Sequence, residues 1–275
     1  MIRLGLTGWN GHRGLDGLQG YSAQFSIVEV DSSFYAMQPA RNYEKWARNT
    51  PDDFGFVVKA YQGMTGHQRG DVPFASKREM FAAFLNSIQP VRDAGKLKMV
   101  LFQYPPWFDC TRPHVDVLRY TKEKMGDLPL ALEFRHQSWF SPEMQERTLS
   151  FMKQEGWIHS IVDEPQVNPG SVPIVLQPTD PQLTLIRFHG RNREAWLEPS
   201  GENWRERRYL YRYNEEELTS WAQRIHELQQ STSEVCIIFN NNSGGDAVPN
   251  AKQLAEMLGV KYKGEPPGQI SFFDL

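Results

Sequence analysis

Several short apolar runs in this sequence end in charged or polar side chains. Glu133, Arg135 and His136 close one such run, and Lys59 and Asp163 close two others. Carboxylates, imidazoles and ammonium groups are the side chains that enzymes use as acids, bases, nucleophiles and metal ligands. We therefore predict a catalytic or ligand-binding site. Its candidate residues at the ends of these runs are Glu29, Asp31, Lys59, Gln103, Glu133, Arg135, His136, Asp163, Arg187, His189, Asn240 and Asn241.

Metal-dependent hydrolysis of a phosphoester is the first chemistry that fits this set. A divalent metal ion would activate water and stabilise the leaving oxygen, while cationic side chains would hold the anionic ester. The sequence has no His-x-x-His or similarly compact ligand motif. The residues assigned to this chemistry are Glu133, His136, Asp163 and His189 at the metal, and Lys59, Arg135 and Arg187 at the anion.

Two other chemistries need fewer residues. Lys59, desolvated beside Arg135, would lose its proton and form a Schiff base with a carbonyl substrate. Glu133 and Asp163 would act as acid and base on a sugar-like substrate. The alternative to all three chemistries is a structural network of ion pairs, because buried charges must be paired.

The elements that position these residues repeat along the chain. Eight apolar runs alternate with helical patterns, and their starts lie about 33 residues apart on average, the size of one βα unit. This alternation predicts an α/β protein with a single (β/α)8 TIM-type barrel over residues 1–262, and an open doubly wound sheet is the alternative. The runs are Arg3–Leu6, Ser26–Val30, Gly55–Lys59, Met99–Gln103, Leu130–Phe134, Ile158–Val162, Leu183–Phe188 and Glu234–Phe239.

The alternation of side chains within these runs predicts which residues face the barrel interior. The predicted inward residues become polar at the carboxyl end of one strand after another, which is where barrel enzymes place their sites. This series contains Glu29, Asp31, Lys59, Gln103, Glu133, Arg135, Ile161, Asp163, Arg187, His189 and Asn240.

Three segments that follow strands could complete such a site. Gly63–Val72, which contains His67, and Arg191–Tyr213, which is rich in Arg, Trp and Tyr, are long enough to overhang the barrel end. Arg191–Tyr213 could stack on bases and pair with phosphates, or it could be a solvated connection. Pro105–Phe108 could line a pocket wall or simply shape a turn.

The strand ends carry motifs of a known family. They include Gly8-Trp9, the segment from Val28 to Tyr35, the segment from Gln103 to Phe108, the segment from Glu133 to Phe140, His189-Gly190 and Phe239-Asn240-Asn241. From Met1 to Leu258 the chain resembles the YecE-like barrels, the domain of unknown function 72. The resemblance implies a TIM-type barrel and no established activity.

This resemblance adds Trp9 and Tyr35 to the candidate ligand-binding residues. The chain also departs from the family pattern. Asp31 and Ser33 stand where the family usually has Asn and Thr, and Gly66 separates Thr65 from His67 where the family usually has adjacent residues. The first departure adds a negative charge to the site, and the second leaves the role of His67 open.

Composition limits the classes of function. The net charge of −3 and pI of 6.2 exclude a protein that coats nucleic acid by bulk charge. No apolar run approaches the ~18 residues of a membrane span, and the sequence starts on a strand pattern rather than a signal peptide. Cys110 and Cys236 show no metal-ligand spacing. We expect a cytoplasmic protein without membrane association.

The segment 263–275 is predicted to be a Pro/Gly linker followed by a peptide motif. Gln269, Ile270, Phe272 and Phe273 match the short peptide with which bacterial proteins dock on the DNA sliding clamp. The glutamine would hydrogen-bond at the pocket rim, and the apolar side chains would fill the pocket. The alternative is that the two phenylalanines pack on the barrel.

These observations lead to one expectation for function and two alternatives. We expect an enzyme that acts on an anionic substrate, phosphorylated or nucleic acid, recruited to the sliding clamp and supported by a divalent metal. The alternatives are a Schiff-base lyase that uses Lys59 and a clamp-tethered protein that binds a ligand or nucleic acid without catalysis.

Overall fold

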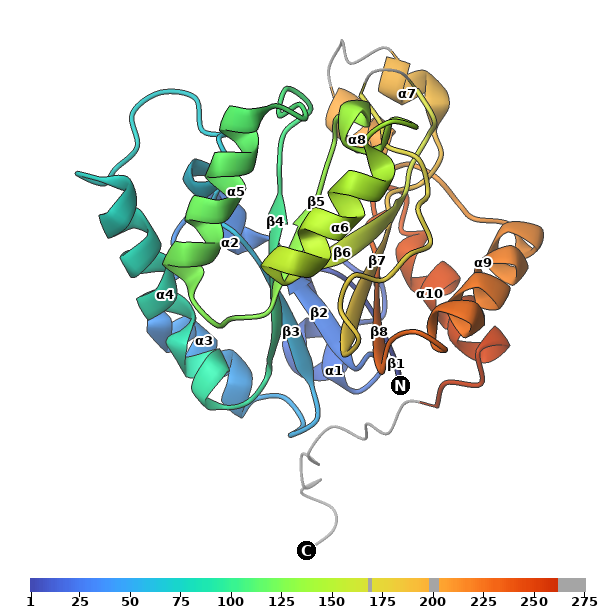
Figure 1. The fold of residues 1–275 in the computed structure, drawn as a ribbon. Coiled ribbons are helices and arrows are strands. Elements are labelled where there is room, and N and C mark those ends of the chain that lie inside the picture. The colour runs from blue at the N-terminus through green and yellow to red at the C-terminus, as the bar shows by residue number, and fades with distance from the viewer. Residues whose placement is uncertain (168–169, 198–202, 262–275) are drawn as a thin grey trace, which may run out of the picture.

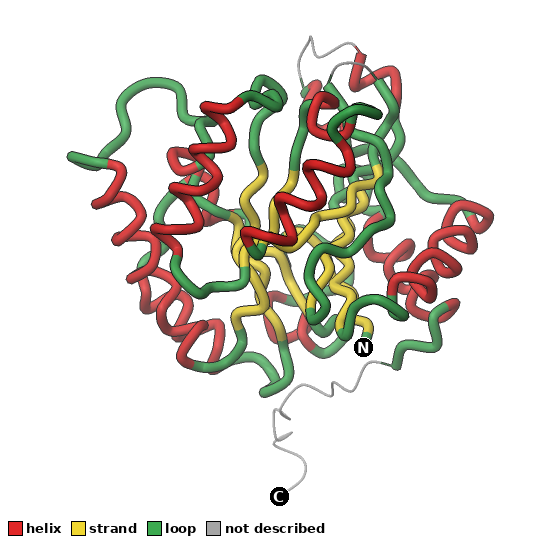
Figure 2. The backbone as a smooth tube through the Cα atoms, in the orientation of Figure 1, coloured by secondary structure: helices red, strands yellow, loops and turns green. Residues whose placement is uncertain are grey.

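The computed structural model describes residues 1–167, 170–197 and 203–261. In this part of the chain, parallel strands close into one barrel in which each strand pairs with the next and the last pairs with the first (Figures 1 and 2). This confirms the predicted TIM-type barrel. The strands are β1 (Ile2–Thr7), β2 (Ile27–Val30), β3 (Gly55–Lys59), β4 (Leu97–Gln103), β5 (Leu130–Glu133), β6 (Trp157–Asp163), β7 (Leu183–Phe188) and β8 (Glu234–Phe239).

Helices surround the barrel and connect its strands. Local sequence defines where two of them start. The Ser76 side chain accepts a hydrogen bond from the Glu79 amide, and Asn214 with Glu217 forms a complete capping box. The helices are α1 (Gly17–Ser22), α2 (Ser32–Tyr35), α3 (Ala40–Arg48), α4 (Lys77–Asp93), α5 (Arg112–Met125), α6 (Gln145–Glu155), α7 (Arg193–Leu197), α8 (Trp204–Arg208), α9 (Glu215–Leu228) and α10 (Ala247–Met257), with 3-10 turns η1 (Gln62–Met64) and η2 (Gln137–Phe140).

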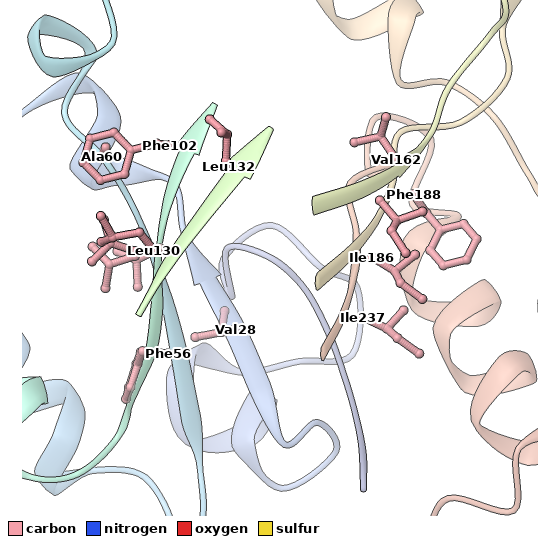
Figure 3. Packing of buried hydrophobic residues seen from close by; sticks show 14 of the residues in the cluster. Val28, Phe56, Ala60, Phe102, Leu130, Leu132, Val162, Ile186, Phe188 and Ile237 are labelled. Atoms are coloured by element: carbon pink, nitrogen blue, oxygen red, sulfur yellow. The ribbon is translucent and has the colours of Figure 1, made fainter. Parts of the chain in front are cut away.

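Two apolar clusters lie on opposite faces of the strands. Outward residues such as Val28, Phe102 and Ile237 pack against the helices (Figure 3). A smaller cluster fills the barrel and consists of Ile27, Val57, Met99, Leu101, Ala131, Ile158, Leu185, Cys236 and Ile238. These residues fill the barrel interior, and the polar residues come later on the same strands. The polar residues therefore lie at the carboxyl ends of the strands.

The predicted inward face is wrong on one strand, β6. Ile158 belongs to the inner cluster and Ser160 hydrogen-bonds to the inward Glu133, so residues of this parity face the interior. Ile161 packs in the outer cluster, and Asp163 binds Trp221 of α9 outside the barrel. The first residues on the two faces of β6, Trp157 and Ile158, are both apolar. The sequence pattern therefore does not indicate which face of this strand points into the barrel.

The first two strands are joined by a tyrosine hydroxyl. Tyr21 Oη accepts a hydrogen bond from the Leu6 amide at 2.7 Å and donates one to the Ile27 carbonyl at 2.8 Å. Gly5 makes room for this arrangement, because a Cβ at this position would lie 2.8 Å from Tyr21 Oη and collide with the Ile27 carbonyl. The bridge holds β1 beside β2, whose end carries Glu29.

The connection 191–213 lies on the side of the barrel where the strands end (Figure 1). It contains α7 and α8, and Asn192 ties it together by donating to the carbonyls of Arg207 and Leu210. None of the described helices has the length and apolar character needed to cross a bilayer. Residues 262–275, which include the predicted linker and peptide motif, lie outside the described residues.

Candidate functional site

Arg187 lies at the centre of the polar layer at the carboxyl ends of the strands. Its Nε and Nη2 donate to the two carboxylate oxygens of Glu29 at 2.8 and 2.7 Å. Its Nη1 donates to Glu133 Oε2 at 2.8 Å. All three side chains are at most 1% exposed. Two buried carboxylates are thus held by one arginine, a strong arrangement because the hydrogen bonds are charge-assisted.

Arg135 extends this network from the end of β5. Its Nε donates to Glu133 Oε1 at 2.7 Å and its Nη1 donates to Glu164 Oε2 at 2.5 Å. Its Nη2 lies 2.8 Å from His189 Nε2. Although burial alone would raise the pKa of Glu133, Arg187 and Arg135 outweigh it and hold that pKa well below its usual range. Glu133 is therefore a permanent carboxylate.

His189 completes the network as a neutral imidazole. Burial, reinforced by the charges of Arg135 and Arg187, holds its pKa well below the usual value. Its Nε2 accepts from Arg135, and its Nδ1 lies 3.0 Å from the amide of Asn240. Both ring nitrogens are therefore engaged within the protein, and His189 positions the guanidinium of Arg135.

Lys59 and Asp31 form a separate pair that is partly exposed to solvent. Lys59 Nζ lies 2.8 Å from Asp31 Oδ1, with side chains 12% and 27% exposed. Burial alone would lower the pKa of Lys59, but Asp31 and Glu29 outweigh it and the net shift is upward. Lys59 therefore keeps its proton, contrary to the expected unprotonated amine of a Schiff-base lysine.

His67 joins the site through aromatic contacts that sequence analysis did not predict. Phe34 lies below the Lys59 ammonium, 4.5 Å from Nζ to the ring centroid. The His67 ring contacts Phe34 at 5.1 Å and Trp107 at 6.0 Å between centroids. Burial, reinforced by the charges of Lys59 and Arg135, lowers the pKa of His67 to about 4. The imidazole is therefore neutral at pH 7.

The His67 side chain is held by Thr65. Its Nδ1 lies 2.8 Å from Thr65 Oγ1, and this hydroxyl donates to the Gln62 carbonyl. In the tautomer whose Nδ1–H donates to Thr65, Nε2 carries the lone pair. The length of the Gly63–Val72 segment predicts that it overhangs the barrel end, but the contacts of His67 with Phe34 and Trp107 depend on a loop path that no periodic pattern encodes.

The connection 191–213 reaches the same site, as its length predicted. Trp196 lies under two guanidinium groups, with its ring centroid 5.7 Å from Arg135 Cζ and 3.5 Å from Arg208 Cζ. The Tyr209 ring lies 6.2 Å from the His189 ring. Among the described residues, the buried Arg208 Nε has no hydrogen-bond partner.

Two predicted site residues point away from the barrel interior. Asp163 is fully buried, accepts hydrogen bonds from Arg191 at 2.7 and 2.6 Å, and accepts another from Trp221 Nε1. Asn241 donates to the Tyr211 carbonyl at 2.9 Å and to Asn250 Oδ1 at 3.0 Å. Both residues anchor the connection 191–213, and the expected pairing of Asp163 with Glu133 as acid and base is wrong.

The other predicted residues lie at the rim or apart from the network. Gln103 Oε1 accepts from Arg187 at 3.4 Å. Trp9 packs edge-on against Trp46, and Tyr35 is 61% exposed beside Phe34. His136 Nδ1 lies 2.7 Å from Ser138 Oγ. Within the described residues, no hydrogen bond or ion pair links His136 to the arginine network.

The donor set does not suit a divalent metal ion. Glu29, Glu133 and Glu164 each accept charge-assisted hydrogen bonds from an arginine. Over residues 1–167, 170–197 and 203–261, no group of three or more His, Cys, Asp or Glu side chains is placed to bind a metal. The expected ligands Asp163 and His136 point elsewhere, Asp163 to Arg191 and Trp221 and His136 to Ser138.

Glu164 gives the site a pH dependence that the sequence did not reveal. Burial raises its pKa to about 7, against 4.5 when unperturbed, although Arg135 opposes the shift. The native state then binds more protons than the unfolded state between these pH values, so this group lowers stability as pH rises through them. We expect the stability of Glu164→Gln relative to the wild type to increase between pH 5 and 8, measured by urea unfolding.

An exposed carboxylate provides the control for this prediction. Glu123 is 68% exposed, so the stability of Glu123→Gln relative to the wild type should change little over the same pH range. A pH-independent difference for Glu164→Gln would show that Glu164 stays ionised in the native protein.

Comparison with known proteins identifies the family. A family model described as "Protein of unknown function DUF72" matches residues 3–270. The chain belongs to the DUF72 family. It is 57% identical over 282 residues to UPF0759 protein YunF of Bacillus subtilis (strain 168), covering 99% of this chain and 100% of that protein. It is 26% identical over 228 residues to UPF0759 protein YecE of Escherichia coli (strain K12), covering 72% and 80%.

Solved DUF72 structures have the same fold. The family protein EF0366 of Enterococcus faecalis V583 superposes with a TM-score of 0.94 at 37% identity, covering 98% of this chain and 100% of that chain. The family protein TM1631 of Thermotoga maritima MSB8 gives a TM-score of 0.78 at 32% identity, covering 94% and 99%. The names of these DUF72 proteins state no activity.

Proposed function

We propose that the carboxyl-terminal mouth of this barrel binds a phosphorylated molecule, with the Lys59 ammonium as its main anion contact. The observation that carries the proposal is the electrostatic environment of His67. The two charged neighbours that shift its pKa are Lys59 and Arg135, both cations. His67 is therefore flanked by two cations, an arrangement that favours an anion beside it.

Lys59 is the cation best able to reach a ligand. Arg187 and Arg135 donate from all three of their nitrogens to groups within the protein, whereas Lys59 donates to Asp31 alone among the described side chains. An ammonium has three protons, so Lys59 has donors for phosphate oxygens. Phe34 supports its position from below.

His67 supplies the acid–base group for an enzymatic form of this proposal. It is neutral at pH 7, and in the tautomer whose Nδ1–H donates to Thr65 its Nε2 carries the lone pair. Such an imidazole can accept a proton from a water molecule that attacks phosphorus while Lys59 stabilises the negative charge that develops on the phosphate oxygens. The P–O bond to the alcohol then breaks, and the imidazolium returns the proton to the departing alkoxide. This scheme replaces the metal-dependent hydrolysis expected from the sequence with one that uses the protein's own side chains.

Charge variants at Lys59 and Asp31 test the anion contact. We expect Lys59→Gln to weaken binding of inorganic phosphate by about tenfold or more, ~1.4 kcal/mol, because a cation at the anion is lost. The reciprocal variant Asp31→Asn should strengthen binding, because it removes the competing carboxylate. Isothermal titration calorimetry measures both effects. Equal affinities for the wild type and both variants would exclude Lys59 as the contact.

Two further measurements identify the class of phosphorylated ligand and show whether the protein turns it over. A mononucleotide and a short single-stranded oligonucleotide present the same phosphate group, and their relative affinities distinguish a small-molecule site from a nucleic-acid site. Release of phosphate or alcohol from a bound ester, lost in His67→Ala, would identify an enzyme. Tight binding without turnover would identify a binding protein.

Recruitment to the DNA sliding clamp is a second proposal, carried by the sequence motif at Gln269–Phe273. A tethered peptide would raise the local concentration of the barrel near DNA, which would compensate for its net charge of −3. We expect micromolar binding to a bacterial clamp, lost in the triple variant Gln269→Ala, Phe272→Ala, Phe273→Ala. Surface plasmon resonance measures it, and absence of binding by the intact protein would rule out recruitment.

A further inference from the structure

A cavity of about 580 Å³ lies beside the barrel mouth, between α4 and α5. These two helices run next to each other on one side of the barrel (Figure 1). The segments that follow β3 and β4 form the rest of the wall. The lining includes Met80 and Phe81 of α4, Val117 and Tyr120 of α5, and Trp107 and Phe108 after β4.

Five aromatic side chains and two methionines line this wall. Phe108 stacks on Tyr104 with 4.1 Å between ring centroids, and Phe81 meets Tyr120 edge-on at 5.7 Å. The Met80 thioether lies beside them. Such surfaces favour a flat ring, which gains stacking and sulfur–aromatic contacts beyond simple burial. The volume lies within the range of ~300–1,000 Å³ that is typical of small-molecule sites.

The cavity adjoins the proposed phosphate site through two residues. Trp107 lines the cavity, is 57% exposed, and contacts the His67 ring at 6.0 Å. Thr65 also lines the cavity and is hydrogen-bonded to His67. His67 in turn contacts Phe34, the ring below Lys59. An exposed indole between an apolar cavity and a cation can cover a ligand that occupies both.

We propose that this cavity binds the aromatic ring of the phosphorylated ligand, so that the ligand is an aromatic phosphate ester of the size of a nucleoside monophosphate. The inference rests on the proposed function for the position of the phosphate. It adds a site for the ring, formed by α4, α5 and Trp107. The phosphate site at Lys59 alone would bind any phosphate ester. The cavity adds a preference for esters that carry a flat apolar group.

Three probes separate the two parts of the site. AMP carries ring and phosphate, adenosine carries the ring alone, and inorganic phosphate carries the anion alone. Val117 is half-buried on the cavity wall, so Val117→Trp places an indole in the cavity. We expect this variant to weaken AMP and adenosine binding by tenfold or more and to leave phosphate binding unchanged. Lys59→Gln should weaken AMP and phosphate binding but not adenosine binding.

A matched variant and a second cavity variant control for loss of binding that is caused by misfolding. Glu123→Trp adds the same indole to α5 at an exposed position outside the cavity, and should bind AMP as the wild type does. Trp107→Ala removes an exposed ring without filling the core, and should also weaken AMP binding. AMP affinity that is unchanged in Val117→Trp and Trp107→Ala, or no greater than phosphate affinity, would overturn the cavity proposal. Loss of phosphate binding only in Lys59→Gln would still support the proposed function.

Discussion

Replacement of Arg187 by Met is expected to lower the free energy of unfolding by about 3–5 kcal/mol. Arg187 makes three hydrogen bonds shorter than 3 Å to Glu29 and Glu133, whose side chains are both fully buried. Methionine would leave Glu29 without its only ion-pair partner among the described residues. An uncompensated buried carboxylate is costly because the protein interior cannot solvate it. For a protein of this size the melting temperature should fall by roughly 6–20 °C.

Two further variants make this prediction specific. Arg187→Met combined with Glu29→Met should recover at least half of the loss, because replacing both members of a buried ion pair by apolar residues avoids the unpaired charge. Arg92→Met removes an arginine whose pair with Asp127 is exposed, so it should change stability by less than about 1 kcal/mol. Differential scanning calorimetry measures all three variants. Equal melting temperatures for Arg187→Met and Arg92→Met would contradict a stabilising role for the network.

The barrel was predictable because strand periodicity and spacing are local properties of the sequence. The inner cluster of Ile27, Val57 and Leu101 follows from simple alternation, and the polar residues beyond it follow from the same alternation. The prediction of the inward face failed on β6, because apolar residues begin both faces of this strand and Asp163 at its end points outward. Glu164, one residue later, is the carboxylate that reaches Arg135.

The chemistry of the site was less predictable than its position. The sequence placed Glu133, Arg135 and Arg187 together, but it could not show that each carboxylate is matched by a guanidinium. That matching depends on distances across the barrel. It occupies the carboxylate oxygens that would otherwise be available as metal ligands. His67 and Trp107 enter the site from irregular loops, whose paths are set by tertiary contacts such as Thr65 Oγ1 with His67 Nδ1.

Asp163→Asn is expected to destabilise the protein by about 2–4 kcal/mol, because it breaks a buried ion pair whose arginine is partly solvated. The Asp163 carboxylate accepts two hydrogen bonds from Arg191, which is 31% exposed, and one from Trp221. In asparagine an amide NH2 group replaces one carboxylate oxygen. This group would face a donor of Arg191 or Trp221 and could not accept its hydrogen bond. The main consequence should be local, since Arg191 begins the connection 191–213 that carries Trp196 and Arg208 to the site. Limited proteolysis should cut this connection faster in the variant.

A double-mutant cycle separates this anchoring role from the catalytic role that the sequence suggested. If Asp163 acts by holding Arg191, the effects of Asp163→Asn and Arg191→Met on unfolding free energy should be less than additive, with a coupling of about 1–3 kcal/mol. Asp127→Asn, at an 87% exposed carboxylate, serves as the control and should change neither stability nor proteolysis. A catalytic Asp163 would instead give a variant of normal stability that binds phosphate and fails to turn over its ester. The outward position of Asp163 on β6 favours the first result, because its carboxylate contacts α9 and Arg191 and does not reach the barrel mouth.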